Sequence, residues 1–450
     1  MNHLKRLAAV GMACLFATAP SFAQGVKPVI VAQITKDDPA YRAAFAESLA
    51  KPGDPAVLVR YAELAVRAGN LEGAISALER LLLIDADQPR IRLELGVLYY
   101  RLGSYQAARN YLEGARTSAS AHPETRARAD EFIAMIDANT TKSTFSGEVL
   151  AGLGFSTNAN SGPSGSIKSL GTNIVPTPTV SSRSDFNAFT AASLHHRYDL
   201  DRQDGGQVES DLSVYASRQF QVSEANVALV DFTTGPRTSP FDGWADDMSI
   251  KPFFTGRYVA VNDLTTYWAW GIGMEASSPI GDHTTATLSI LGRRREFVNN
   301  ADSPTNNSSS GNEVVNTLAF QIKASKVFSF GFNTGFLRYI AMVPSESYTQ
   351  IALSGSVSAT FVDPLGLNGK AWLAVLNAGI ARAVYDQPDP SVDPTTTRSQ
   401  NDVTFSFVLG VPLDDRFTLV TQAAYTRRDA SISNYAYEAF STLAGVSLRF

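Results

Sequence analysis

Residues 144–450 of this sequence carry a sustained alternation of apolar and polar side chains, which limits the possible folds more than any other feature. In residues 206–220, for example, one face comprises Val208, Leu212, Val214, Ala216 and Phe220. A strand with lipid on one side and water on the other requires this period of two. No run of about 18 apolar residues follows the N-terminal region, so we expect no transmembrane helix. The pattern predicts an antiparallel transmembrane β-barrel.

Fourteen segments fit the barrel pattern. They are residues 144–155, 184–200, 206–220, 224–233, 247–260, 263–276, 282–297, 313–326, 328–340, 347–362, 370–383, 400–411, 416–428 and 435–450. An even number places both ends of the barrel chain on one side of the membrane. The pattern is weakest at 220–246, so twelve or sixteen strands also fit the sequence. Long polar segments at 157–183, 298–312 and 384–399 fall at alternate connections, and we expect them to face outward.

The last predicted strand ends on Phe450, with Leu448 and Val446 at the alternate positions before it. This ending resembles the signal that the outer-membrane barrel assembly machinery reads. The alternative is a soluble β-sandwich that ends in Phe, and the sustained alternation argues against it.

Residues 39–138 are rich in Ala, Leu, Arg and Glu with helical periodicity, and they repeat every 34 residues. Pro55, Pro89 and Pro123 keep this spacing, and each is predicted to lie at the start of a helix. The period resembles that of the tetratricopeptide repeat, which is a pair of packed helices. The fold class is therefore a short helical solenoid followed by a barrel of about fourteen strands.

We predict two full repeats, a helix before them at 39–50 and a helix after them at 124–138. Asp54 is the expected N-cap of the first repeat. By analogy with the family, the concave face of the second repeat consists of Arg90, Leu93, Val97, Tyr100 and Arg101. This mixture would suit an extended or helical peptide. In the alternative interpretation, Leu93 and Val97 belong to the core between repeats and the arginines are solvated.

The N-terminus has the pattern of an export signal. Lys5 and Arg6 precede an apolar stretch at 7–19, and a small-residue cleavage site places Ala23 before Gln24. We expect the protein to reach the outer membrane, with its helical domain in the periplasm.

Cys14 is the only cysteine and lies within this signal, so cleavage would leave no disulfide and no thiol chemistry. Lipidation at Cys14 is the alternative, but the residues before it fit poorly. The predicted organisation is signal peptide 1–23, N-terminal extension 24–38, helical domain 39–138, linker 139–143 and barrel 144–450.

The sequence contains no recognisable catalytic motif. Among five histidines, His195 and His196 are neighbours on a predicted strand, so they point to opposite faces and cannot share a metal ion. His196 or His283 could serve a hydrolytic barrel, but nothing marks a partner for either. Arg293, Arg294 and Arg295 are interpreted as charges at a strand end. We therefore expect no enzymatic activity, no metal and no cofactor.

The charge pattern gives little further indication of a ligand or partner. A formal net charge of -5 and a pI near 5.6 give no indication of a nucleic-acid partner. Glu148, Glu209 and Asp211 would project into the barrel lumen if their strands are phased as above. Such an acidic wall is compatible with a passage for proteins or cations, and equally with an ordinary water-filled barrel.

The order of the two domains resembles the surface lipoprotein assembly modulator family, in which a periplasmic tetratricopeptide domain precedes a fourteen-stranded barrel. Residues 152–160, Gly-Leu-Gly-Phe-Ser-Thr-Asn-Ala-Asn, are similar to the first strand of that family and its Asn-x-Asn exit. The resemblance implies a translocon that carries client lipoproteins or soluble secreted proteins to the cell surface. Its other partners would be outer-membrane lipids, the barrel assembly machinery and periplasmic chaperones. The alternatives are an exopolysaccharide export barrel and a porin-like or adhesive barrel.

Overall fold

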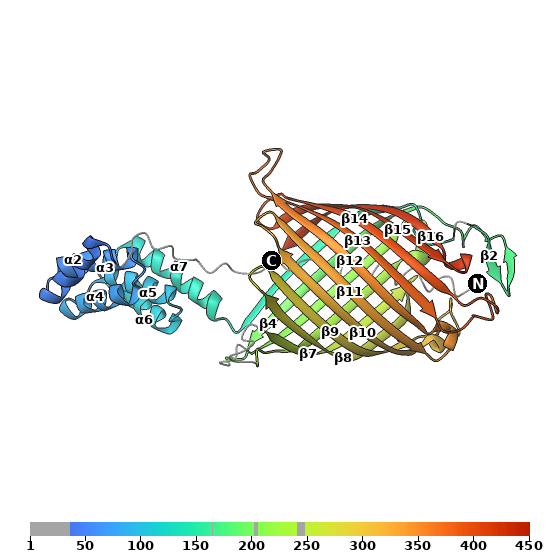
Figure 1. Cartoon of the computed structure of the whole chain (residues 1–450). Helices are drawn as coiled ribbons and strands as arrows, with labels where there is room; N and C mark the ends of the chain where they lie inside the picture. Colours follow the sequence, from blue (N-terminus) through green and yellow to red (C-terminus); the bar gives the residue numbers. More distant parts are fainter. Residues whose placement is uncertain (1–36, 164, 202–205, 241–247) are drawn as a thin grey trace. The chain divides into compact units, whose positions relative to one another are not determined.

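The computed structural model describes residues 37–163, 165–201, 206–240 and 248–450. A helical unit ends at Thr141, and a unit built of strands begins at Lys142 (Figure 1). The signal peptide, its cleavage site at Ala23 and Gln24, and Cys14 lie outside the described residues.

The helical unit contains six helices among the described residues. They are α2 (Pro39–Ala50), α3 (Pro55–Arg67), α4 (Leu71–Ile84), α5 (Pro89–Arg101), α6 (Tyr105–Thr117) and α7 (Pro123–Thr140). The three prolines spaced by 34 residues all start helices, as predicted. The Asp54 side chain accepts hydrogen bonds from the backbone of Ala56 and Val57, so the predicted N-cap is also confirmed.

Small residues let the paired helices approach each other closely. Gly96 on α5 packs directly against Leu112 on α6, and Ala108 is fully buried beside them. A Cβ atom added at Gly96 would lie 2.5 Å from Leu112 Cγ, which is closer than carbon atoms pack. Small residues at this contact therefore have a steric cause.

The second unit is a closed antiparallel barrel of fourteen strands. Its strands are β1 (Ser143–Ser156), β4 (Asp185–Asp199), β5 (Gln207–Gln219), β6 (Val227–Arg237), β7 (Ser249–Val261), β8 (Leu264–Ile280), β9 (Thr284–Phe297), β10 (Gly311–Lys323), β11 (Phe328–Ala341), β12 (Tyr348–Phe361), β13 (Trp372–Tyr385), β14 (Ser399–Pro412), β15 (Phe417–Ala430) and β16 (Tyr437–Arg449). Each strand pairs with its sequence neighbours, and β1 closes the ring against β16.

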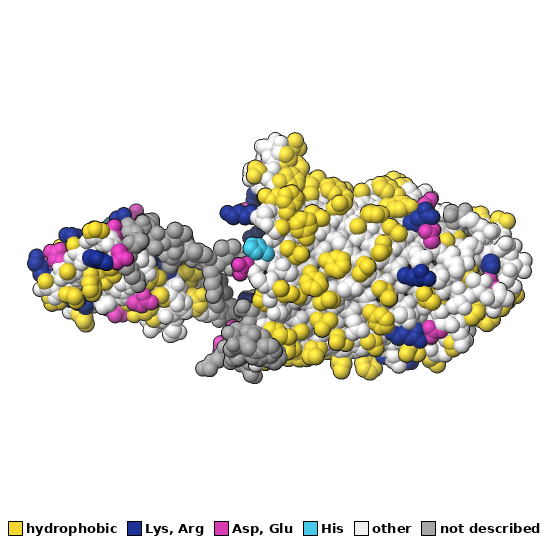
Figure 2. All heavy atoms as spheres, in the orientation of Figure 1, with side chains coloured by type: hydrophobic (Ala, Val, Ile, Leu, Met, Phe, Trp, Pro, Cys, Tyr) yellow, Lys and Arg dark blue, Asp and Glu magenta, His cyan; other side chains and the backbone are white. Residues whose placement is uncertain are grey.

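The two faces of the wall follow from the strand register. Residues directly opposite each other on paired strands point to the same face. Large apolar side chains occupy one phase, and on β8 they are Trp268, Trp270, Ile272 and Met274, all exposed. Figure 2 shows hydrophobic side chains spread over the outer surface of the barrel, with charged side chains gathered toward its ends. The apolar phase therefore faces outward and the polar phase faces the lumen.

The predicted strand count of fourteen is confirmed, including the uncertain region after residue 220, which supplies β6. The long segments at 157–183, 298–312 and 384–399 all lie at the end of the barrel opposite Ser143, as their alternate placement predicted.

The sequence missed a small hairpin in the first of these loops, formed by β2 (Ile167–Ser169) and β3 (Thr172–Ile174). The hairpin makes hydrogen bonds to loop 386–398: the backbone N–H groups of Leu170 and Gly171 donate to the carbonyl groups of Ser391 and Val392. Two three-residue strands are too short to give a periodic signal.

The connection between the units is shorter than the predicted linker. Helix α7 continues to Thr140, because the Thr141 backbone N–H still donates to Asp137. Lys142 already accepts a hydrogen bond from Asp199 at the end of β4. Only Thr141 and Lys142 separate the last helix from β1.

Substitution of Gly96 by Ala should destabilise the helical unit by about 1–3 kcal/mol, because the added methyl group overpacks against Leu112. Gly114→Ala on α6 is the matched control. Its new Cβ would meet only the flexible Arg92 side chain, at 3.3 Å, and Ala is the better helix former by up to about 1 kcal/mol. Urea unfolding of the full chain in detergent, followed by helical circular dichroism, measures both. Equal stabilities for the two variants would contradict the packing argument.

Candidate functional site

The candidate surface on the second repeat divides into exposed and buried parts. Arg90 and Arg101, at the two ends of α5, are exposed. Leu93 and Val97 are buried in a cluster with Ala129 and Ile133 of α7. These two side chains therefore cannot contact a ligand in this structure, which agrees with the core interpretation that the sequence also allowed. Helix α7 supplies the apolar face that covers them.

Tyr100 is half-buried on the same helix. Its ring packs against Tyr105, with centroids 5.7 Å apart, and edge-on against Phe132 of α7, at 5.5 Å. The exposed groups of the predicted face are therefore Arg90 and Arg101, at the two ends of α5, while Tyr100, next to Arg101 in the chain, is only partly exposed.

A partly buried polar bridge between the two repeats was not predicted. Glu79 on α4 accepts hydrogen bonds from the hydroxyl groups of Tyr99, at 2.7 Å, and Tyr111, at 3.0 Å. The two rings stack in parallel with centroids 5.4 Å apart. The hydrogen bond that Tyr99 donates to Glu79, together with burial, raises the pKa of Tyr99 to about 12. Because the bridge joins residues 20 and 32 positions apart, no local sequence pattern marks it.

The lumen wall of β4 to β7 carries Glu209 and Asp211 in a network of ion pairs. Arg237 donates to Glu209 at 2.9 Å, and Lys251 lies 3.1 Å from both carboxylates. His195 Nδ1 lies 2.7 Å from Asp211. Arg237 also contacts Glu275 of β8. The two carboxylates are thus held by basic groups on three neighbouring strands.

Glu148 lies on the lumen face of β1, beside the seam with β16. It accepts hydrogen bonds from Ser447 and from Arg449, the latter at 3.3 Å. All three carboxylates that the sequence assigned to the lumen therefore have basic partners, which compensate their negative charges. The alternation within a single strand identified these acidic residues. Their basic partners lie on other strands, and only the strand register shows that they are neighbours.

Two lumen arginines share one carboxylate. Arg293 and Arg295 on β9 both donate to Glu313 on β10, whose side chain is fully buried. The Arg295 guanidinium also lies over the ring of Tyr339, 4.8 Å from its centroid. Arg294 points outward and pairs with Glu296. The three consecutive arginines thus alternate between the two faces of the wall. The sequence interpreted them as charges at a strand end, but Arg293 and Arg295 are ion-paired in the lumen wall.

The remaining predicted residues have structural partners. His196 points outward, stacks on Phe145 and lies 2.8 Å from Ser143 Oγ. Phe450 exchanges backbone hydrogen bonds with Gly147 on β1, and its ring is 61% exposed on the outer face. The side chains of Val446 and Phe450 thus point outward along the seam that closes the barrel.

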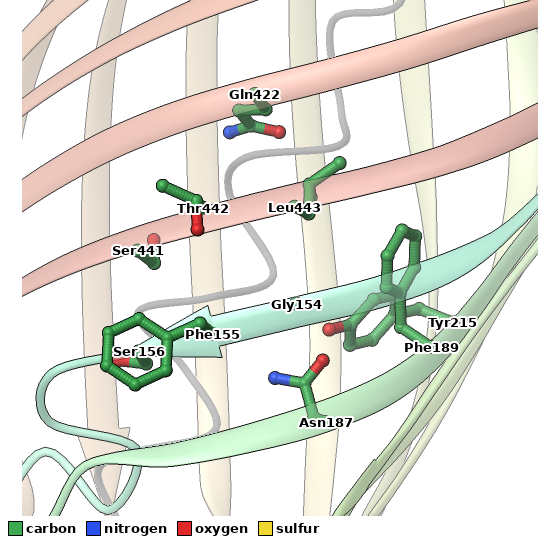
Figure 3. Close-up of a pocket in the computed structure, with 10 residues that line it drawn as sticks. All are labelled: Gly154, Phe155, Ser156, Asn187, Phe189, Tyr215, Gln422, Ser441, Thr442 and Leu443. Atoms are coloured by element: carbon green, nitrogen blue, oxygen red, sulfur yellow. The ribbon is translucent and has the colours of Figure 1, made fainter.

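A pocket lies at the same seam, where β1 meets β16 (Figure 3). Its lining residues are Gly154, Phe155, Ser156, Asn187, Phe189, Tyr215, Gln422, Ser441, Thr442 and Leu443. They offer hydroxyl groups, amides and aromatic rings, and no carboxylate or imidazole is among them.

The described residues carry no cluster of three or more His, Cys, Asp or Glu side chains placed to hold a metal ion. In the same described ranges, no helix is long and apolar enough to cross a membrane.

Comparison with protein families matches residues 61–134 to the tetratricopeptide repeat. This range runs from within α3 to within α7, so it covers most of the first predicted repeat and all of the second. No curated protein matches the chain.

Solved structures resemble each unit separately. The helical part is similar to PcrH in complex with the chaperone-binding region of PopD, with 20% identity over 22% of this chain and 77% of that one, at a TM-score of 0.21. It is also similar to the type III secretion translocator chaperone SycD of Yersinia enterocolitica, with 16% identity over 22% and 70%, at 0.21. The anion-selective porin of Comamonas acidovorans matches 68% of this chain and 99% of its own, with 10% identity and a TM-score of 0.33. The chain thus joins a helical unit that matches the tetratricopeptide repeat over residues 61–134 to a closed antiparallel barrel of fourteen strands.

The Glu79 bridge should make the helical unit sensitive to alkaline pH. The raised pKa of Tyr99 means that the folded state keeps a proton that the unfolded state loses near pH 10. The stability that this proton contributes is present below about pH 10 and is lost as the pH rises toward about 12. Tyr99→Phe should make the stability fall less steeply in this range. Urea unfolding at stepped pH measures the slopes, and equal slopes for wild type and variant would refute the assignment.

Proposed function

We propose that the protein is a non-enzymatic outer-membrane translocon, which takes client lipoproteins or soluble proteins on its periplasmic helical unit and passes them through the barrel to the cell surface. The observation that carries the proposal is the covalent order of the chain. A helical-repeat unit, of the kind whose curved stacks bind other proteins, is joined to the first barrel strand through only Thr141 and Lys142.

This short connection limits how far a bound client can be from the barrel. Helix α7 covers the apolar residues of α5 and also leads into β1, so the client surface and the barrel entrance are consecutive parts of the chain. A flexible tether of tens of residues would bind clients without delivering them to one place. In this proposal, the repeats act on the periplasmic side and the long loops face outside.

The lumen wall fits the passage of a polypeptide. Its charged groups are paired across strands, as at Glu209 with Arg237 and at Asp402 with Arg428. A wall with nearly balanced charge holds neither acidic nor basic segments strongly, which matters for clients of mixed charge. In the described residues no separate plug domain follows α7, since the chain there runs directly into β1.

The resemblance to the surface lipoprotein assembly modulator family supports the same activity. It rests on the domain order and on residues 152–160, which form the end of β1 and its exit. No nucleotide is available in the periplasm, so folding or capture of the client outside would bias the direction of transport.

The first test compares the surface and secreted proteins of a deletion strain with those of its complemented parent, by protease shaving and mass spectrometry. The proposal expects the loss of one or a few specific proteins from the surface and their accumulation in the periplasm. An unchanged protein surface would refute it. Loss of a surface polysaccharide instead would favour an exopolysaccharide exporter, and altered solute uptake alone would favour a porin.

A charge-reversal variant tests the helical surface. Arg90→Glu with Arg101→Glu should reduce the client at the surface severalfold, because both guanidinium groups are exposed at the ends of the candidate face. The matched control reverses Arg42 on α2 and Lys51 at the C-cap of that helix, two exposed cations with only surface ion pairs. Client export is measured with the barrel amount held equal. Equal export by both double variants would exclude this face as the client surface.

A further inference from the structure

The turn between β12 and β13 projects from the barrel and carries large apolar side chains on its surface. Figure 1 shows it, in orange, standing out from the side of the barrel at the end where β1 begins. We call residues 362–371 the apolar turn. Its side chains Val362, Leu365 and Leu367 are 79%, 70% and 63% exposed. Exposed apolar side chains gathered on one short segment indicate a contact surface.

Polar contacts hold the apolar turn in shape. The Asp363 carboxylate accepts hydrogen bonds from the backbone N–H groups of Leu365, at 3.0 Å, and Asn368, at 2.8 Å. The Asn368 side chain donates to the carbonyl oxygen of Pro412, at the end of β14, at 2.6 Å. Gly366 has a φ angle of 66°, in the left-handed region that favours glycine. The exposed leucine side chains are therefore not needed to fold the turn.

The apolar turn continues the outward, lipid-facing surface of the barrel wall. Val357 of β12 and Leu376 of β13 lie opposite each other on that surface, and both are exposed. Figure 2 shows hydrophobic side chains on the projection and on the wall beside it. In the same phase, Phe361 and Trp372 form the last pair of the two strands, with ring centroids 6.3 Å apart. Aromatic girdles of membrane barrels lie at the lipid headgroups, so this pair marks the level of the turn.

We propose that the apolar turn lies in the phospholipid leaflet at this end of the barrel, with Val362, Leu365 and Leu367 at the boundary between headgroups and acyl chains. An apolar element that projects from a lipid-facing wall, at the level of its aromatic girdle, has lipid as its nearest neighbour. The turn carries one carboxylate, Asp363, and one cation, Lys370, so it brings no net charge to the membrane surface.

Contact with lipid gives the apolar turn a role as an anchor. Because polar contacts fix its shape, immersion of the leucine side chains would hold this side of the wall at one depth in the membrane. The turns on either side, residues 324–327 and 413–416, are much shorter. This inference does not depend on the proposed transport activity.

The test places an environment-sensitive fluorophore on the apolar turn of the full chain, reconstituted into vesicles of phosphatidylethanolamine and phosphatidylglycerol. Leu365→Cys in a Cys14→Ser background gives a single labelling site, because Cys14 is the only native cysteine. Lipids with a nitroxide near the headgroup should quench this label severalfold more strongly than iodide in the water does. Quenching by iodide alone would show a turn surrounded by water and would overturn the proposal.

The matched control is a label at Asp282→Cys in the same background. Asp282 is exposed in the short turn between β8 and β9, at the same end of the barrel, and its label should be quenched mainly by iodide. Equal quenching of the two labels by the nitroxide lipids would show only that this end of the barrel is near the membrane, and would overturn the specific role of the apolar turn.

A second copy of this chain is the other occupant that could hide the label from iodide. In that case the protection would grow with the protein-to-lipid ratio and the nitroxide lipids would not quench, which also overturns the proposal. A second variant tests the leucine side chains directly. Leu365→Ser with Leu367→Ser should make a label at Val362→Cys severalfold more accessible to iodide, and unchanged accessibility would count against lipid contact.

Discussion

Closure of the hydrogen-bonded ring of strands is the constraint on which the rest of the barrel depends. In lipid, an unpaired backbone group costs several kcal/mol, so every strand needs a partner on both sides. The seam between β1 and β16 meets this need over residues 148–156 and 441–449, and Phe450 adds backbone hydrogen bonds to Gly147. Once the ring is closed, the period of two is no longer a local preference, because each side chain must face either lipid or lumen.

The closed ring also decides the chemistry of the lumen. Cross-strand neighbours share a face, so a charge on one strand is compensated only by charges on the adjacent strands. Arg293 and Arg295 illustrate this, since both are held by Glu313 of β10. A buried arginine without a carboxylate would be strongly destabilising, which makes the pairs a condition for a polar lumen as much as a feature of it.

The sequence predicted the strands well because alternation is a local signal that the membrane enforces throughout residues 144–450. It predicted the helices for a similar reason, since prolines and small residues recur at the steric contacts of the repeat. It failed where the determinant is a contact between distant residues. The basic partners of Glu209 and the Glu79 bridge to Tyr99 both depend on strand register or helix packing that no short pattern records.

The burial of Leu93 and Val97 under α7 has a functional consequence. A repeat array needs a terminal helix to cover its last apolar face, and here the helix that does so is also the one that enters the barrel. Thr141 is still hydrogen-bonded to the helix, and Lys142 is already hydrogen-bonded to β4. The connection is thus reduced to the single peptide unit between them. In the proposed transport function, the helix that completes the helical unit and the first strand of the barrel are therefore consecutive elements of the chain.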